Sequence, residues 1–232
     1  MKIFFIPFNK KLLTILGIII LIIILFFSIS SKILTTFKPI YQVESARDEI
    51  ALTCNVVWGT EYIPMILDIL KNEDTKMTFY IGGKWAEENP EELKKIHQGG
   101  HEIGNHGYDH KKHSKLNDID NENEIINAEK AIEKIINEKT NLFAPPYGDI
   151  NERTVEIAES LGYRVVMWNK DTIDWRDQDP QKIYDRVFKN KLQGGLVLMH
   201  PTDATVKALP AIIKDIKKQN VKLVKVSDLI KE

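Results

Sequence analysis

Residues 76–105 read KMTFYIGGKWAEENPEELKKIHQGGHEIGN, and this stretch contains a complete strand–helix–strand unit. The segment 76–81, rich in β-branched and aromatic residues, and the short segment 102–105 are expected to be strands. A helix is expected at 90–98, because it starts with proline and is followed by Gly99-Gly100, a common helix stop. This order predicts two parallel strands joined by a right-handed crossover.

The same alternation continues along the chain. Five further strands are expected at 50–57, 141–144, 164–168, 196–199 and 221–226, and five further helices at 61–71, 118–138, 152–161, 180–192 and 204–219. Strands that alternate with helices predict an α/β fold with parallel strands, wound as an open sheet or as a barrel. In either architecture the functional site lies on the loops that follow the C-terminal ends of the strands.

The N-terminal region contains an uncharged run at 12–29, LLTILGIIILIIILFFSI. A run of this length as a helix crosses a bilayer core of roughly 30 Å. We therefore expect one transmembrane helix there. A cleavable secretory signal peptide is the alternative, since Ser28 and Ser30 are small, although the apolar part of such a peptide usually has only about 7–15 residues.

The charges around this run predict its orientation. Lysines precede it, and positive residues tend to remain in the cytoplasm, so 1–11 is expected to be a cytoplasmic N-terminus. A tether at 30–47 and a domain at 48–232 would then follow outside the cytoplasm. The chain is thus expected to be a single-pass protein of the cell membrane.

Composition limits the partners of the domain. Residues 47–232 hold 27 basic and 32 acidic residues, a net charge of −5, which lacks the basic surface of a nucleic-acid-binding protein. Cys54 is the only cysteine, so no disulfide can form within the chain. The expected partners are therefore the membrane and a substrate, with no nucleic acid.

The sequence His106-Gly-Tyr-Asp-His110 follows an expected strand. Two imidazoles four residues apart could meet one metal ion if the segment formed a helical turn, and zinc binds neutral imidazole nitrogen at about 2.0–2.1 Å. A pair at this spacing is weak evidence on its own. We predict a metal site here, with zinc as the expected ion.

Six motifs in a fixed order strengthen this prediction: IALTCNVVWG at 50–59, KMTFYIGG at 76–83, GGHEIGNHGYDH at 99–110, FAPPYG at 143–148, DTIDW at 171–175 and LVLMH at 196–200. Together they resemble the NodB-type polysaccharide deacetylases, a carbohydrate esterase family, over residues 49–229. The resemblance implies a distorted, incomplete (β/α) barrel of about seven parallel strands. It also implies metal-assisted hydrolysis of N-acetyl groups on aminosugar polymers such as peptidoglycan or chitin.

The resemblance assigns roles to several residues. His106 and His110 match the two metal histidines. His200 matches the catalytic acid, and Asp174 would hold its imidazole in the protonated form. Three further positions would complete the pocket: Trp175 and Leu198 as walls for the acetyl methyl group, and the Tyr147 backbone N–H as an oxyanion donor.

Three positions depart from the family. Two adjacent aspartates usually end the first strand, one as general base and one as third metal ligand, but this chain has Asn55 and Val56. Ala144 replaces an arginine that orients the base. An arginine without its carboxylate would be an unpaired buried charge, so the three losses are consistent with one another. An amide cannot act as a general base at neutral pH, which makes standard activity doubtful.

Another carboxylate could replace the missing metal ligand. Glu61 at the start of the helix expected at 61–71 is the first candidate. An acidic residue there is also explained without a metal, because the helix dipole stabilises a negative charge at the N-terminus. Asp109 and Asp171 are weaker candidates, since both are typical turn residues.

Three functions remain open. The first is a membrane-anchored polysaccharide deacetylase homologue that acts on N-acetylated polymers of the cell envelope with an altered or lost base. The alternative is a non-catalytic glycan-binding pseudoenzyme, in which Trp58, Tyr147, Trp175 and the histidines contact sugar, although Trp58 could equally be a core residue. A third function is a scaffold in cell-wall or spore-envelope assembly during sporulation.

Overall fold

The computed structural model describes residues 10–33, 38–46 and 48–231, which belong to two compact units divided after residue 37. The first unit contains one helix, α1 (Lys10–Ile33). Most of the predicted cytoplasmic segment 1–11 lies outside the described residues. No helix in the described ranges combines the length and the apolar character needed to cross a membrane. The transmembrane helix at 12–29 therefore stays a prediction.

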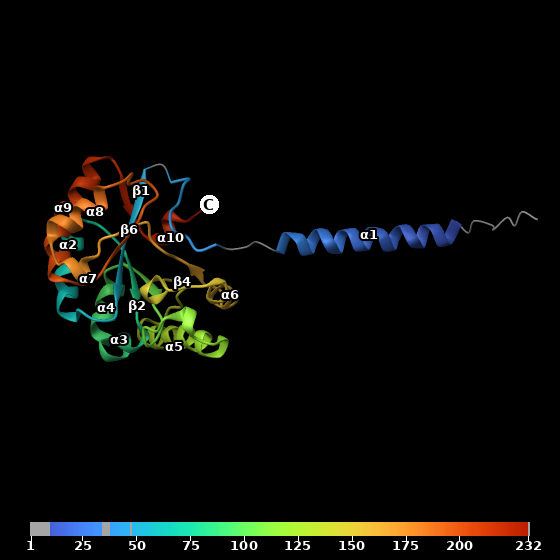
Figure 1. Ribbon diagram of the computed structural model, residues 1–232, viewed down its shortest axis with the longest axis horizontal. Coiled ribbons are helices and arrows are strands. Elements are labelled where there is room, and N and C mark those ends of the chain that lie inside the picture. The colour runs from blue at the N-terminus through green and yellow to red at the C-terminus, as the bar shows by residue number, and fades with distance from the viewer. Residues whose placement is uncertain (1–9, 34–37, 47, 232) are drawn as a thin grey trace, which may run out of the picture. The chain divides into compact units, whose positions relative to one another are not determined.

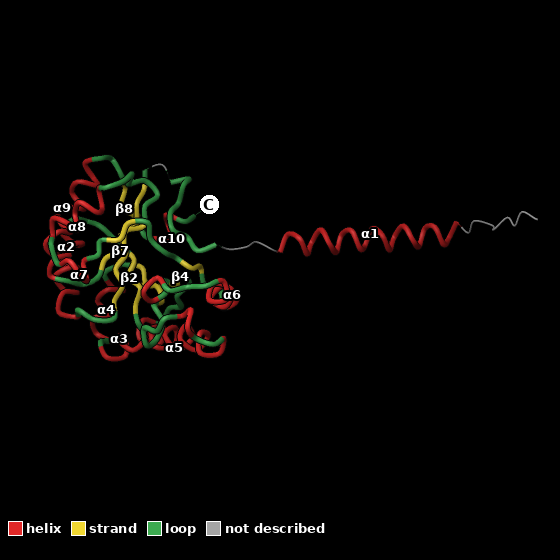
Figure 2. Tube along the Cα trace, in the orientation of Figure 1, coloured by secondary structure: helices red, strands yellow, loops and turns green. Residues whose placement is uncertain are grey.

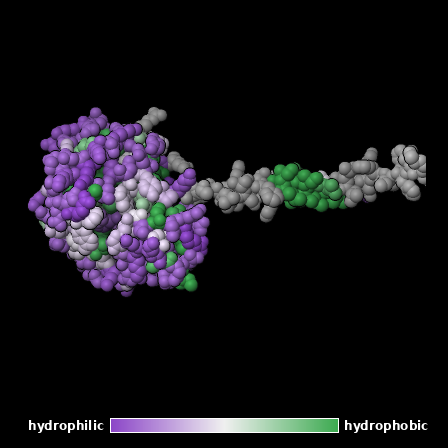
Figure 3. Space-filling model, in the orientation of Figure 1, coloured by the Kyte–Doolittle hydropathy of each residue, from purple (hydrophilic) through white to green (hydrophobic). Residues whose placement is uncertain are grey.

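Helix α1 carries large apolar side chains on its surface. Ile15, Leu16 and the residues 18–24 each expose between 49% and 59% of their surface. Figure 3 shows them as a hydrophobic region, whereas the surface of the second unit is mostly hydrophilic.

The second unit is built on one parallel sheet. In the described residues, seven strands follow the order β5-β4-β3-β2-β1-β7-β6, and β8 pairs with β1 beside this path. The strands are β1 (Glu49–Val56), β2 (Thr78–Ile81), β3 (Glu102–Asn105), β4 (Leu142–Phe143), β5 (Arg164–Val165), β6 (Lys170–Asp171), β7 (Leu196–Met199) and β8 (Lys222–Val224). The predicted α/β half-barrel of about seven parallel strands is confirmed, and Figure 2 shows the strands gathered at the centre of the unit.

Helices cover the outside of the sheet in two groups. In Figure 1, α2, α8 and α9 lie together on one side and α3, α4 and α5 on another. The helices are α2 (Ile63–Asn72), α3 (Gly83–Glu88), α4 (Pro90–Gln98), α5 (Asp118–Ile136), α6 (Glu152–Ser160), α7 (Asp174–Asp177), α8 (Pro180–Phe188), α9 (Asp203–Lys218) and α10 (Val226–Leu229). Polar side chains define several helix starts: Asn117, Asn151 and Thr202 each accept a hydrogen bond from a backbone N–H in the first turn of α5, α6 and α9.

Alternation along β1 separates two cores. Leu52, Cys54 and Val56 belong to the core between sheet and helices, which also contains residues of α2, α4 and α9. Ala51 faces a smaller core inside the half-barrel, together with residues of α10. Successive strand side chains point to opposite faces, so Asn55 lies on the inner face with Ala51.

Part of the segment predicted as a tether packs on this domain. The Ile40 N–H donates to the Val165 carbonyl at 2.9 Å, and the Met167 N–H donates to the Ile40 carbonyl at 2.8 Å. The Val43 N–H donates to the Gly194 carbonyl at 2.9 Å. Residues 38–46 therefore link the open β5 end of the sheet to the turn before β7.

Candidate functional site

A pocket of about 480 Å³ opens at the C-terminal ends of the strands. Its lining comes from the loops after β1, β3, β4 and β7 and from the β5–α7 region. The lining residues are Asn55, Val57, Trp58, His106, His110, Tyr147, Trp168, Asp171, Trp175, Leu198 and His200. Most of the residues singled out from the sequence thus meet in one cavity.

His106 directly follows β3 and is almost fully buried, with 1% of its surface exposed. Its Nδ1 lies 2.5 Å from the Ala144 carbonyl, which can only accept, so Nδ1 carries the proton and Nε2 is left with a lone pair. Burial, followed by the neighbouring His110, lowers the pKa of His106 well below its usual value. The imidazole is therefore neutral at physiological pH.

His110 lies in a loop, so the helical turn expected between the two histidines does not form. Gly107 and His110 both adopt the left-handed backbone region, with φ of 72° and 56°. The ring of His110 lies 5.1 Å from that of His106 and 4.4 Å from that of Tyr147, between centroids. Burial is the main cause that lowers the pKa of His110 to about 4.

Two buried side chains hold this loop. The Asn105 Oδ1 accepts a hydrogen bond from the Gly107 N–H at 2.8 Å. Glu124 of α5 accepts hydrogen bonds from the N–H groups of Tyr108 and Asp109, at 3.1 and 2.9 Å. The loop that carries the histidine pair is thus held by the end of β3 and by α5, the next α-helix along the chain.

Asp174 is fully buried and accepts hydrogen bonds from four donors. Its carboxylate accepts from the backbone N–H of His200 at 2.6 Å and of Trp175 at 2.9 Å, and from the Thr205 hydroxyl at 2.5 Å. The Nδ1 of His200 lies 2.8 Å from the same carboxylate. The pair predicted from the sequence is therefore formed, with the Nε2 of His200 left to face the pocket.

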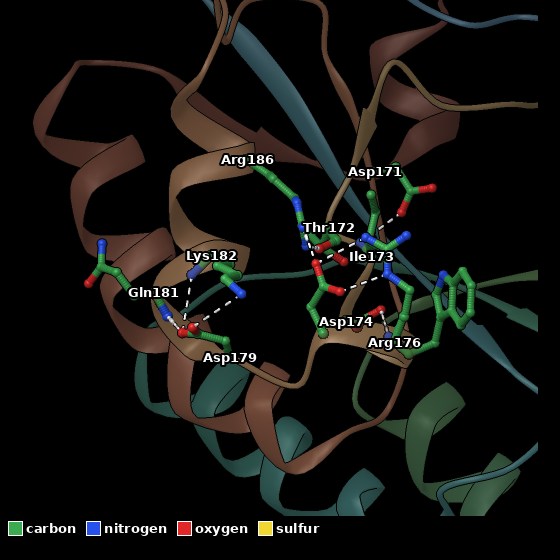
Figure 4. Close-up of polar contacts among 11 residues, drawn as sticks. Asp171, Thr172, Ile173, Asp174, Arg176, Asp179, Gln181, Lys182 and Arg186 are labelled. Atoms are coloured by element: carbon green, nitrogen blue, oxygen red, sulfur yellow. Dashed lines mark hydrogen bonds and ion pairs between the residues drawn. The ribbon is translucent and has the colours of Figure 1, made fainter.

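The turn that carries Asp174 is strained and clamped. Ile173 has φ of 52°, an unusual value for a β-branched residue that costs about 1–3 kcal/mol. Its N–H donates to the Asp171 carboxylate at 2.8 Å. Arg186 of α8 donates to the Thr172 carbonyl at 2.6 Å and pairs with Asp177. Figure 4 shows these contacts converging from α8 onto the turn.

Asn55 is 3% exposed, and its Oδ1 has no hydrogen-bond partner in the described part of the chain. The adjacent Val56 is fully buried in the helix-facing core and does not line the pocket, whereas Val57 does. Ala144 is 2% exposed, and its carbonyl is occupied by His106. The three departures from the family pattern therefore leave an unpaired amide on the pocket wall.

Aromatic rings surround the opening. Trp58 is stacked on His200 with ring centroids 5.7 Å apart and planes 8° apart, and it is 42% exposed, so it is not a core residue. Tyr147 and Trp175 are 62% and 52% exposed. Trp168 also lines the pocket, although the sequence analysis gave it no role; its place at the end of the expected strand 164–168 was the available signal.

The three acidic candidates for a third metal ligand do not complete a site. Glu61 is exposed and lies outside the pocket lining. Asp109 is ion-paired with Lys111 at 3.1 Å. Asp171 lines the pocket, but one of its oxygens accepts the Ile173 N–H.

The donor set does not fit a catalytic divalent metal. Within the described ranges, no group of three or more His, Cys, Asp or Glu side chains could hold such an ion. His106 and His110 are neutral donors, and Asn55 adds only a neutral amide oxygen. A zinc site of the catalytic type has three protein ligands from His, Cys, Asp or Glu, so a third is lacking.

Comparisons with known proteins agree with these features. The family model described as polysaccharide deacetylase matches residues 42–166. The chain is 37% identical over 195 residues to the uncharacterized protein YlxY of Bacillus subtilis, covering 84% of this chain but only 61% of that protein. It is 34% identical over 197 residues to a peptidoglycan-N-acetylglucosamine deacetylase of Bacillus cereus, covering 82% of this chain and 92% of the relative.

A solved structure is also similar. BA3943 of Bacillus anthracis, described as a CE4 family pseudoenzyme, superimposes with a TM-score of 0.82 at 36% identity, over 85% of this chain and 70% of that one. A mutant of the same protein is described as having restored enzymatic activity.

Proposed function

The chain belongs to the polysaccharide deacetylase family, and from that premise we propose that it is a glycan-binding pseudoenzyme for N-acetylated aminosugar polymers of the cell envelope, with peptidoglycan as the expected polymer. The observation that carries the proposal is Asn55. It lies on the pocket wall with an unpaired Oδ1, at the position where the family has its catalytic base.

The chemistry of hydrolysis supports this proposal. Hydrolysis of an acetamide requires an activated water molecule. A carboxylate acting as general base and a bound metal ion usually activate it. The amide of Asn55 cannot take a proton from water at neutral pH. His106 and His110 alone leave the metal site one ligand short.

The retained parts of the pocket suit binding. Trp58, Tyr147 and Trp175 present exposed ring faces around a cavity of about 480 Å³. The flat faces of aromatic side chains pack favourably against the apolar face of a sugar ring. The similarity to a peptidoglycan deacetylase supports a cell-wall glycan as the ligand, and the similarity to a CE4 pseudoenzyme supports binding without turnover.

Slow hydrolysis is a second candidate, favoured by the intact His200–Asp174 pair. A carboxylate with four hydrogen-bond donors holds this imidazole in place, and its Nε2 remains available to the pocket. In this candidate His200 would both activate the water and protonate the leaving amine.

One experiment separates the two candidates. The full chain would be tested for binding of tetra-N-acetylchitotetraose by calorimetry and for release of acetate from the same oligomer, with and without added Zn²⁺. We expect binding and no acetate. Acetate release that disappears in His200→Ala would favour slow hydrolysis, and absence of both binding and release would refute both candidates.

We also propose that residues 12–29 anchor the protein in the cell membrane with the domain outside the cytoplasm. The uncharged run and the exposed apolar side chains of α1 support this part of the proposal. Cell fractionation of the full chain and of a variant lacking residues 1–33 tests it. Recovery of both in the same soluble fraction would refute the anchor.

A further inference from the structure

Asn55 differs from the other unpaired polar groups of the domain. In the described residues, three buried side-chain atoms have no hydrogen-bond partner: Asn55 Oδ1, Tyr80 OH and His113 Nε2. Of these three residues, only Asn55 lines the pocket. An unpaired buried acceptor destabilises the folded protein, and a ligand with a matching donor would remove that cost.

The acetamido group of an N-acetylated sugar supplies such a donor. It has one N–H and one carbonyl, and a carboxamide has the complementary acceptor and donors. We propose that Asn55 makes the pocket a reader of acetylation state, which binds N-acetylated aminosugars and rejects those with a free amine. This inference rests on the proposed function and adds a specificity to it.

The charges around the pocket support the discrimination. A free aminosugar carries an ammonium group with donors only, and its burial is costly without a carboxylate partner. His106 and His110 also line the pocket, but an imidazole side chain supplies no negative charge. An aspartate at position 55 would supply that charge, whereas the amide does not.

The carboxylates of the pocket region are already engaged. Asp174 accepts from four donors and is fully buried. Asp171 lines the pocket, but its Oδ1 accepts the Ile173 N–H, and it interacts electrostatically with Arg176. Asp174 is therefore no free partner for an ammonium group, and the charge of Asp171 is partly balanced by the Ile173 N–H and by Arg176.

The test compares two oligomers with the full chain. Calorimetry would measure the affinities for tetra-N-acetylchitotetraose and for the corresponding glucosamine tetramer at about pH 6 with EDTA, where the amine is charged. We expect the acetylated tetramer to bind at least about tenfold more tightly. Only this tetramer has the acetamido N–H that pairs with Asn55, and an unpaired buried acceptor lowers affinity. In Asn55→Asp this ratio should fall, because the carboxylate attracts the ammonium.

Controls separate specificity from folding and from the proposed function. Asn123→Asp makes the same change on an exposed site of α5 and should keep the wild-type ratio. If Asn55→Asp does not fold, Asn55→Ser replaces it and should also lower the ratio. Equal affinities in the wild type, an unchanged ratio in folded position-55 variants, or binding that requires added Zn²⁺ would overturn the inference and leave glycan binding intact. Binding of neither tetramer would refute the proposed function itself.

Discussion

The two sides of the pocket differ in how completely their polar groups are paired. On the β7 and α9 side, the carboxylate of Asp174 accepts hydrogen bonds from four donors, and His200 is held in one orientation. On the β1 side, Asn55 keeps an unpaired buried oxygen. The first side is therefore organised by the protein alone, whereas the second keeps an unpaired acceptor, to which we assign the proposed ligand. Four changes test or sharpen this difference.

The largest effect is expected for Asp174→Ala. Removing this carboxylate leaves two backbone N–H groups and the Thr205 hydroxyl without their acceptor, so the free energy of unfolding should fall by about 3–5 kcal/mol. Chemical denaturation measures it. Asp68→Ala, on the exposed face of α2, is the control and should have no measurable effect. A loss as small as that of the control would show that the paired side is not organised as described.

Acid should have the next largest effect. Burial lowers the pKa of His110 to about 4 from 6.5, so between these pH values the unfolded chain takes up a proton that the folded chain does not. Stability should therefore decrease as the pH falls from about 6.5 to about 4. The same holds for His101, at the opposite end of β3.

The histidine contributions can be separated by mutation. Unfolding free energies measured across this pH range should depend less on pH in His110→Gln, and likewise in His101→Gln. If both variants keep the wild-type pH dependence, the imidazoles of His110 and His101 are not its cause.

A smaller effect is expected for Arg186→Ala. This change removes the hydrogen bond to the Thr172 carbonyl and releases the strained turn at Ile173, so the free energy of unfolding should fall by about 1–2 kcal/mol. Because the turn carries Trp175, the intrinsic fluorescence and the glycan affinity should change as well.

Arg176→Ala is the matched control, since Arg176 pairs with the same Asp177 from an exposed position. It should leave the free energy of unfolding unchanged within error. Equal effects of the two arginines would argue against a clamp that depends on Arg186.

The smallest effect, and the only gain, is expected for Asn55→Leu. Removing an unpaired buried amide should raise the free energy of unfolding by up to about 1 kcal/mol and abolish glycan binding. Asn121→Leu is the control, because Asn121 is equally buried but hydrogen-bonded to His113 and Thr154, and it should destabilise the protein. Destabilisation by both variants would mean that the side chain of Asn55 has a hydrogen-bond partner in solution.

Most of the fold could be predicted from the sequence, because its strands and helices are local patterns. The segments 102–105, 90–98 and 196–199 are observed with the expected bounds. Strand β6 could not be predicted, since Lys170 and Asp171 carry no apolar pattern and pair only because Val197 and Leu198 lie beside them. Helix α7 was missed for a similar reason: it starts after a left-handed isoleucine that a distant arginine holds in place.

The site could be predicted where it depends on strand ends and motifs. His106, His110, Leu198 and His200 line one pocket, as the order of the motifs implied. Alternation along the expected strand 50–57 also places Val56 with Cys54, in the helix-facing core rather than in the pocket. The unpaired oxygen of Asn55 was not visible, since hydrogen-bond satisfaction depends on all neighbours at once.

The contacts of residues 38–46 also constrain the order in which the chain can fold. This segment is synthesised before the rest of the domain, yet its backbone partners, Val165, Met167 and Gly194, come much later in the sequence. Strand β1 likewise pairs with β7 and β8, which are synthesised later. Such long sequence separations make folding slow, because loop closure must precede the contacts that reward it. The sheet therefore cannot be completed until β7 and β8 have been synthesised.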